Sequence, residues 1–460
     1  MKKYLIVAML ALMSINASAV SHTSTIDDRL NLDLTIYNSN IAMIKDKRSP
    51  IEGVDAVILM DNISDQIKPE TLSFLGGQVK EFNYSYNIAT HESMLKSMVG
   101  QQITVQNEDL KYKAQLLSAN GDRILVKRTS PESGIVSLPK NDSDWVYYFD
   151  EIPDHLTSSP TLTIDAYNLD DSNIEVIYLT TGLSWNANYV ASLIDSENLS
   201  LNAWVTINNQ TSTNYQNANI SVVAGSPNIQ SPQSMREEGF RVSAMMSKSM
   251  ADIEPNNVGD YKMYTIPFKT TLREKEKKQV ALFNSPHVQY EKNYDHIIGN
   301  SNYGSVKPTK SKAKVFISMH NIEAKGLGKA IPAGSVRFYE KDANGKSQFI
   351  GENKISNLSK GEETKLFIGE AFDLTIQESI VSEVNVTRNI LQRTYRLDVT
   401  NAKDTNEGVD LILPMNASMK IISSTIEHKA VPGKGYVFPV SLAGSSMVRL
   451  EFKVIYTYEK

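Results

Sequence analysis

Hydrophobic and polar residues alternate with a period of two along most of the chain. In residues 32–37, Leu32, Leu34 and Ile36 are separated by polar residues, which places the apolar side chains on one face of a strand. One apolar and one wet face per strand is typical of antiparallel sheets. The pattern therefore predicts a mostly β protein built from antiparallel, immunoglobulin-like sandwich domains. Further strand-like runs lie at 54–59, 162–167, 175–179, 201–207, 220–224, 314–319, 336–339, 395–399, 409–413 and 448–458.

Two Asn-Gly pairs mark hairpins between such runs. Asn120-Gly121 and Asn344-Gly345 each stand between apolar runs, and both residue types tolerate the positive φ that a type I′ turn requires. Asp342 also begins a faint calcium-loop pattern, but Asn353 stands where that loop needs a glutamate. We therefore expect hairpins at both positions.

Helical signals are scarce, and the clearest lies at 92–99. Thr90 is its expected N-cap and Gly100 follows its end. Five short strand-like runs follow, at 103–105, 112–117, 124–126, 135–138 and 145–149. This order is typical of a small barrel. Sm-like barrels share it, although the leader described below argues against an RNA role.

The strands before the barrel are expected to pair with those after it, which makes the barrel an insertion into the first sandwich. Residues 231–259, which are rich in methionine, show neither the strand period of two residues nor the helix period of about 3.6, and this predicts a flexible loop. The alternative is a methionine surface that binds a partner. Residues 293–311 are expected to form a second polar loop. The predicted parts are a first sandwich (20–89 and 153–230), the inserted barrel (90–152), the loop (231–259) and a C-terminal sandwich region (260–460).

The N-terminus has the features of an export signal. Lys2 and Lys3 precede the apolar run 4–13, and Ala17-Ser18-Ala19 fits the small-residue cleavage rule. We expect residues 1–19 to be removed, the alternative being a buried N-terminal helix. No later run approaches the 18 apolar residues of a membrane span, so the mature chain is expected to be periplasmic or secreted, without a transmembrane segment.

Composition narrows the class further. The 460 residues are 41% hydrophobic and 22% charged, which excludes collagen, coiled coil and wholesale disorder. The 47 basic and 52 acidic residues give a net charge of -5. Nucleic-acid binders carry a basic stripe, so this charge argues against a nucleic-acid partner. Because there is no cysteine, the chain has neither disulfides nor a lipoprotein anchor.

Motifs of chemistry are weak. Gly182-Leu183-Ser184-Trp185-Asn186 resembles a nucleophile elbow, but it ends in Asn and is flanked by strands on both sides. The seven histidines lack zinc spacing, and their default interpretation is scattered surface positions. Neighbouring carboxylates such as Glu362-Glu363 point to opposite faces of a strand. The sequence therefore predicts no catalytic, cofactor-binding or metal-ligating residue and no cofactor.

A resemblance to a known family covers most of the chain. The blocks 178–190, 201–209 and 222–228, with 264–267, 278–283, 331–337 and 369–373, resemble a bacterial domain of unknown function found in mucoidy-inhibitor-A-like proteins. The resemblance implies a mostly β, exported protein with a loose association to capsule or envelope polysaccharide. It implies no catalytic residues.

Three aromatic residues in these blocks have two interpretations. Trp185, Tyr189 and Trp204 are expected to pack in one core, since buried aromatics dominate sandwich cores. The alternative is a sugar-stacking platform.

The function that these observations favour is a non-catalytic binding or structural module of the cell envelope, whose partner is a protein or a cell-surface polysaccharide. The alternative is a hydrolase of cell-surface polysaccharide, with two carboxylates meeting in a groove.

Overall fold

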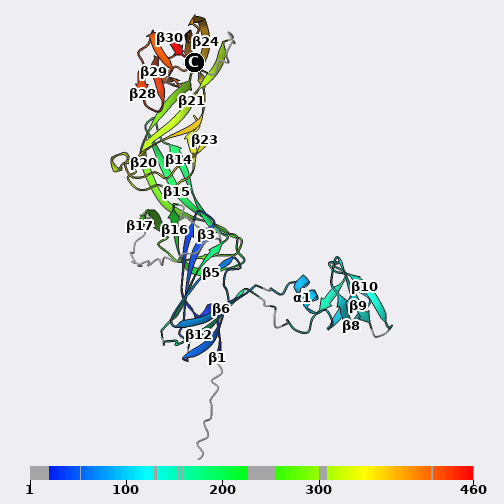
Figure 1. Ribbon diagram of the computed structural model, residues 1–460. Helices are drawn as coiled ribbons and strands as arrows, with labels where there is room; N and C mark the ends of the chain where they lie inside the picture. The colour runs from blue at the N-terminus through cyan, green and yellow to red at the C-terminus, as the bar shows by residue number, and fades with distance from the viewer. Residues whose placement is uncertain are drawn as a thin grey trace, which may run out of the picture. The chain divides into compact units, whose positions relative to one another are not determined.

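The computed structural model describes residues 20–51, 53–86, 88–128, 132–153, 156, 159–170, 172–225, 255–299, 308–415 and 418–458. The predicted leader and residues 231–254 of the predicted loop lie outside these ranges. The described residues are mostly strand, with one α-helix, α1 (His91–Ser97), and the 3-10 turns η1 (Ile26–Asp28) and η2 (Glu323–Lys325) (Figure 1). The expected mostly β fold with antiparallel, sandwich-like sheets is confirmed, while immunoglobulin-like topology stays a prediction. No helix in the described ranges is long and apolar enough to cross a bilayer.

The chain divides into two compact units, of which the first comprises Met1–Ser184, Asn208–Ser226 and Phe268–Lys278. One of its sheets has the order β1-β4-β12-β6, and a second contains β16-β2-β3-β13-β5 with β19 beside β16. Most neighbours are antiparallel, but β1 with β4 and β16 with β2 are parallel. The strands are β1 (Val20–Ser24), β2 (Arg29–Tyr37), β3 (Ile41–Arg48), β4 (Asp55–Met60), β5 (Ile67–Leu75), β6 (Gln78–Ser85), β12 (Thr161–Tyr167), β13 (Ile174–Thr181), β16 (Tyr215–Ala224) and β19 (Thr270–Leu272).

Strands from both sides of residues 90–152 share these sheets. β12 pairs with β4 and β6, and β13 pairs with β3 and β5. Thr161, at the start of β12, lies opposite Ser85, at the end of β6. The chain therefore leaves a sheet and returns to the adjacent position in it.

Residues between these two points form a small five-stranded sheet with its own core. Its order is β10-β9-β8-β7-β11. The core contains Leu95 of α1 together with Val105, Leu116, Ile124 and Val126, all inaccessible to solvent. The strands are β7 (Gln102–Gln106), β8 (Lys111–Ser118), β9 (Arg123–Arg128), β10 (Gly134–Pro139) and β11 (Val146–Tyr148).

The second unit comprises Trp185–Ile207, Pro227–Pro267 and Gln279–Lys460. Its large sheet has the order β23-β22-β14-β15-β20-β21-β24-β25-β30-β27, with β26, β28 and β29 paired alongside. Residues 185–207, expected in the first sandwich, group with this unit instead. The strands are β14 (Leu183–Leu193), β15 (Asn198–Asn209), β20 (Lys277–Ile297), β21 (Thr309–His320), β22 (Gly334–Lys341), β23 (Ser347–Ile355), β24 (Glu363–Thr387), β25 (Ile390–Asn401), β26 (Glu407–Leu413), β27 (Met419–Ser424), β28 (Lys429–Val431), β29 (Gly435–Leu442) and β30 (Ser446–Thr457), with a hairpin of β17 (Asn256–Val258) and β18 (Tyr261–Thr265).

Three predicted connecting segments differ in detail from the structure. The hairpins at Asn120-Gly121 and Asn344-Gly345 exist, but only the glycines have positive φ, at 72° and 75°, so neither is a type I′ turn. In the second loop, Asp342 Oδ1 accepts the backbone N–H groups of Asn344 and Lys346 and thereby supports a longer connection. The loop expected at 293–311 is strand up to Ile297 and again from Thr309.

The aromatic prediction was correct for two residues of three. Trp185 and Tyr189 are buried in β14, whereas Trp204 of β15 is 39% exposed. Trp204 lies between the buried Ala203 and Val205, and alternation turns it to the opposite face.

Candidate functional site

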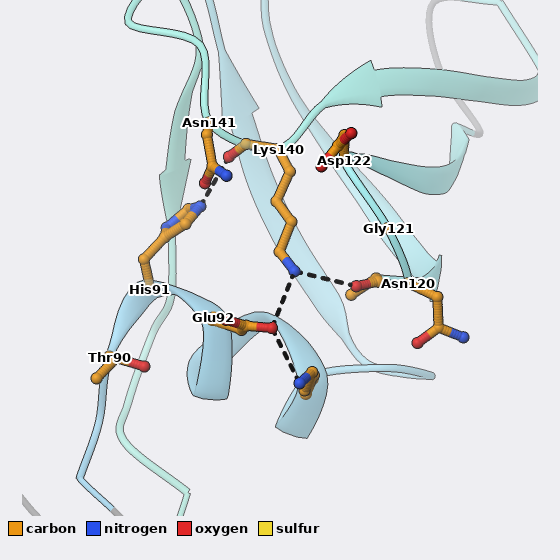
Figure 2. A pocket seen from close by; sticks show the side chains of 10 residues that line it. Thr90, His91, Glu92, Asn120, Gly121, Asp122, Lys140 and Asn141 are labelled. Atoms are coloured by element: carbon orange, nitrogen blue, oxygen red, sulfur yellow. Dashed lines mark hydrogen bonds and ion pairs between the residues drawn. The ribbon is translucent and has the colours of Figure 1, made fainter.

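A polar hollow lies on the small five-stranded sheet that was predicted to be a barrel, and its volume is about 750 Å³. It opens between the start of α1, the β8–β9 loop and the segment after β10 (Figure 2). The lining residues are Thr90, His91, Glu92, Lys96, Ala119, Asn120, Gly121, Asp122, Lys140 and Asn141.

The first wall of the hollow is fixed by the cap of α1. Thr90 Oγ1 accepts the backbone N–H of Ser93, and Ser93 Oγ accepts that of Thr90, which satisfies two unpaired donors of the first turn. Met94 and Leu95 are buried on the inner side of the helix. Glu92 and Lys96 are therefore left on the outer side, one turn apart and 2.9 Å from each other.

Lys140 forms the floor of the hollow. Its side chain is only 8% exposed, which is rare for lysine. The ammonium lies 3.5 Å from Glu92 Oε1 and donates to Ala119 O at 3.4 Å (Figure 2). These are two long contacts among the described residues for a group that carries three hydrogens, so the ammonium retains capacity to bind an acceptor.

His91 closes one side of the hollow through contacts in two directions. Its Nε2 lies 2.9 Å from Lys140 O, and since a carbonyl only accepts, this nitrogen carries the hydrogen. The imidazole also lies 5.7 Å from the Tyr147 ring, whose hydroxyl donates to Pro139 O. The two rings therefore connect α1 to the backbone of Pro139 and Lys140.

The charges in the hollow are held in defined states. The hydrogen bond from Lys96 and the charge of Lys140 lower the pKa of Glu92, so this carboxyl remains ionised under mildly acidic conditions. Burial raises the pKa of Tyr147 to about 12, which keeps its hydroxyl a donor. The hollow thus presents ammonium, carboxylate, amide and imidazole groups, of which Lys140 and His91 are held by contacts with neighbouring residues.

A second hollow, of about 320 Å³, lies in the second unit. His320 occupies it with both ring nitrogens near acceptors, Nδ1 at 3.5 Å from Glu363 Oε1 and Nε2 at 3.1 Å from Gly361 O. The lining also includes Glu197, Glu291 and Lys325. Three carboxylates therefore line one opening.

The sequence did not identify either hollow. Their sequence spacing leaves His91 and His320 among scattered histidines, and Glu92 has no sequence signal beyond the start of a helix. The buried Lys140 had no signal beyond its position after a strand, because its burial depends on contacts with residues 92 and 119. Ser184, considered and rejected as a nucleophile, lies within β14 rather than at a strand-to-helix turn.

No family model matches the chain, and no curated protein matches it either. Across the described ranges, no three His, Asp or Glu side chains converge closely enough to hold a metal ion.

Proposed function

We propose that the protein is an exported, envelope-associated or secreted module that binds a cell-surface polysaccharide through the hollow of its small barrel. The mucoidy-inhibitor-A-like resemblance and the leader predicted at residues 1–19 support export and the envelope setting. The observation that carries the proposal is the nearly buried Lys140 on the floor of a polar hollow.

The hollow is suited to a ligand rich in hydroxyl groups. Asn120, Asn141 and Asp122 line its rim and are exposed. Their amide and carboxylate oxygens can accept hydrogen bonds from sugar hydroxyls, and the amide N–H groups can donate to them. Lys140 and His91 are already fixed by their neighbours. A preorganised site loses less side-chain entropy on binding.

The test is affinity electrophoresis of the mature chain through gels containing isolated bacterial envelope polysaccharide. Lys140→Met and Asp122→Asn are expected to weaken binding about tenfold, since hydrogen bonds to charged groups contribute roughly 1.5–3 kcal/mol. Lys113→Met and Asp109→Asn are matched controls, because both side chains are exposed on the same barrel outside the hollow. Unretarded wild type, or equal retardation of all variants, would contradict the proposal.

A polysaccharide hydrolase is the second candidate, and the second hollow favours it. Glu197, Glu291 and Glu363 line that opening, and glycoside cleavage requires two carboxyl groups across a cleft. Release of reducing sugar by the wild type and its loss in Glu363→Gln would support this function. Unchanged release in both Glu363→Gln and Glu291→Gln would exclude the site.

A further inference from the structure

A serine, a histidine and a glutamate stand in series in the second unit, outside both hollows. Ser311 Oγ lies 3.4 Å from His296 Nδ1 and also donates to Ile376 O at 3.5 Å, and Glu378 Oε2 lies 3.4 Å from His296 Nε2. The residues come from β21, β20 and β24, and β21 pairs with both other strands. One imidazole is therefore placed between a hydroxyl and a carboxylate.

The position of Glu378 is unusual for its strand. Leu374, Ile376 and Glu378 alternate onto the same face of β24, and all three are buried. An apolar residue is expected at the position of Glu378, because burying a carboxylate costs free energy unless it is paired. Glu378 is held by His296 and by the backbone N–H of Gly299, 3.1 Å from its Oε1.

This order of groups matches the roles needed for nucleophilic catalysis. A serine is activated when a base within reach accepts its proton and a third group orients the base. Contacts of this kind are often longer before substrate is bound. In the usual triad, histidine Nε2 faces the serine and Nδ1 faces the carboxylate. Here Nδ1 faces Ser311 and Nε2 faces Glu378, but each group keeps its role.

We infer that Ser311, His296 and Glu378 form an acyl-transfer site that hydrolyses carboxylic esters. Ser311 Oγ attacks the ester carbonyl carbon while its proton passes to His296, which then delivers that proton to the departing alkoxide. Water next attacks the acyl-serine, His296 takes the proton of the water, and the carboxylic acid leaves as the proton returns to Ser311 Oγ. Glu378 acts as a positioning residue that orients the imidazole.

The hydrogen-bond donors near Ser311 favour esters over amides as substrates. Among the described residues, the backbone N–H group that bonds to these three side chains is that of Gly299. It donates to Glu378 and therefore does not serve as an oxyanion donor beside Ser311. Loss of one oxyanion donor costs roughly 10²–10³ in rate, which an ester with a good leaving group tolerates and an amide does not. Ser311 is half-buried, so small acyl groups are favoured.

The experiment uses the full mature chain and two probes, a fluorophosphonate and p-nitrophenyl acetate. Fluorophosphonate forms a P–O bond to Ser311 and releases fluoride, and peptide mass mapping of the wild type is expected to locate the adduct on Ser311. Ser311→Ala should lose both the adduct and the release of nitrophenolate. Ser379→Ala is the matched control, since it is a half-buried serine on β24 whose hydroxyl donates to Arg396 O.

Three further variants separate catalysis from a structural role. His296→Gln should slow labelling about 100-fold, as expected for loss of a general base. Glu378→Gln should slow labelling because the imidazole is less well oriented, and Glu378→Asp should restore part of the rate because a carboxylate again faces His296. An unlabelled wild type, an adduct on another serine, or labelling independent of His296 would overturn the inference.

Discussion

Asp46 is held between two arginines in the interior of the first unit. Arg29 donates to both carboxylate oxygens, at 2.9 and 2.7 Å, and Arg48 Nη2 lies 2.9 Å from Oδ2. Arg48 is completely buried and also donates to the carbonyls of Ser24 and Asp61. The network therefore joins the end of β1 to β2, β3 and the segment after β4.

Arg48→Met is expected to lower the free energy of unfolding of the first unit by about 3–5 kcal/mol, because it leaves buried acceptors without their partner. Urea unfolding followed by circular dichroism measures the change. Lys47→Met, on the same strand and less buried, is the control and should stay within about 1 kcal/mol. Equal losses in both variants would show that the network does not stabilise the unit.

The same network predicts a loss of stability in acid. Burial disfavours the charged form of Asp46, but the hydrogen bond from Arg29 and the charge of Arg48 outweigh it and lower the pKa of Asp46. A lowered folded pKa contributes stability above the unfolded value of about 3.9, and this contribution is lost as the pH falls through the folded value. The urea midpoint of wild type should therefore exceed that of Asp46→Asn at about pH 6, and the gap should shrink below about pH 4.

At the scale of single elements, alternation decides which side chains are buried. Trp185 is 4% exposed and Trp204 is 39% exposed, although both lie in long, hydrophobic strands. The direction of each side chain follows from its position in the strand. The sequence pattern of β15 already contained this information, and grouping Trp204 with Trp185 by residue type was the error.

Trp185→Ala is expected to destabilise the second unit by about 3–5 kcal/mol through the cavity it leaves. Trp204→Ala should cost much less, because solvent already covers part of the indole. Urea midpoints by circular dichroism compare the two variants directly. A larger loss for Trp204→Ala would mean that its outer face packs against something in the native protein.

The helix α1 shows how much a local signal can determine. The cap at Thr90 was expected from sequence and is present, whereas the helix ends at Ser97, two residues before the expected end at Val99. Capping depends on residues within three positions of each other, so no tertiary information is needed.

Thr90→Ala is expected to destabilise α1 by about 1 kcal/mol. The measurement is hydrogen exchange of the α1 amides in the full chain, which should become roughly fivefold faster if they exchange by local opening. Glu108→Ala, in an exposed loop of the same barrel, should leave these rates unchanged. Unaltered α1 exchange in Thr90→Ala would show that packing of Met94 and Leu95 alone sets its stability.

For the molecule as a whole, the five-stranded sheet that was predicted to be a barrel is inserted between two paired strands and has its own core. The chain leaves at Ser85 and returns at Thr161, and these residues are partners in an antiparallel pair. A short turn is sufficient to join such partners. Among the described residues, the hydrophobic cluster of this sheet and the side chains packed against it lie between Leu95 and Phe149.

Replacing residues 86–160 by a four-residue turn centred on Asn-Gly is therefore expected to leave the remaining sheets folded. The truncated protein should keep its far-UV β spectrum and a cooperative thermal transition within a few degrees of the parent. Residues 88–153, expressed alone, should give dispersed amide signals. Aggregation of the truncated chain would mean that the barrel contributes to the stability of the sheets around it.

The fold was more predictable than the sites. Strands at 32–37, 162–167 and 395–399 were located because alternation and β propensity are properties of neighbouring residues. The hollow joins residues 92, 119 and 140, and the Ser–His–Glu series joins residues 296, 311 and 378. Neither has a characteristic spacing, because each depends on which strands become neighbours.

Local sequence patterns are enough to specify the class of the protein: strands with one apolar face, a capped helix before a series of short strands, and few catalytic motifs. These follow from interactions between residues close in the chain. By contrast, the burial of Lys140 beside Glu92, the position of Asp46 between two arginines and that of His296 between Ser311 and Glu378 depend on the tertiary fold. Strand pairing over tens of residues brings these groups together, and the cost of burying charge then forces them into contact.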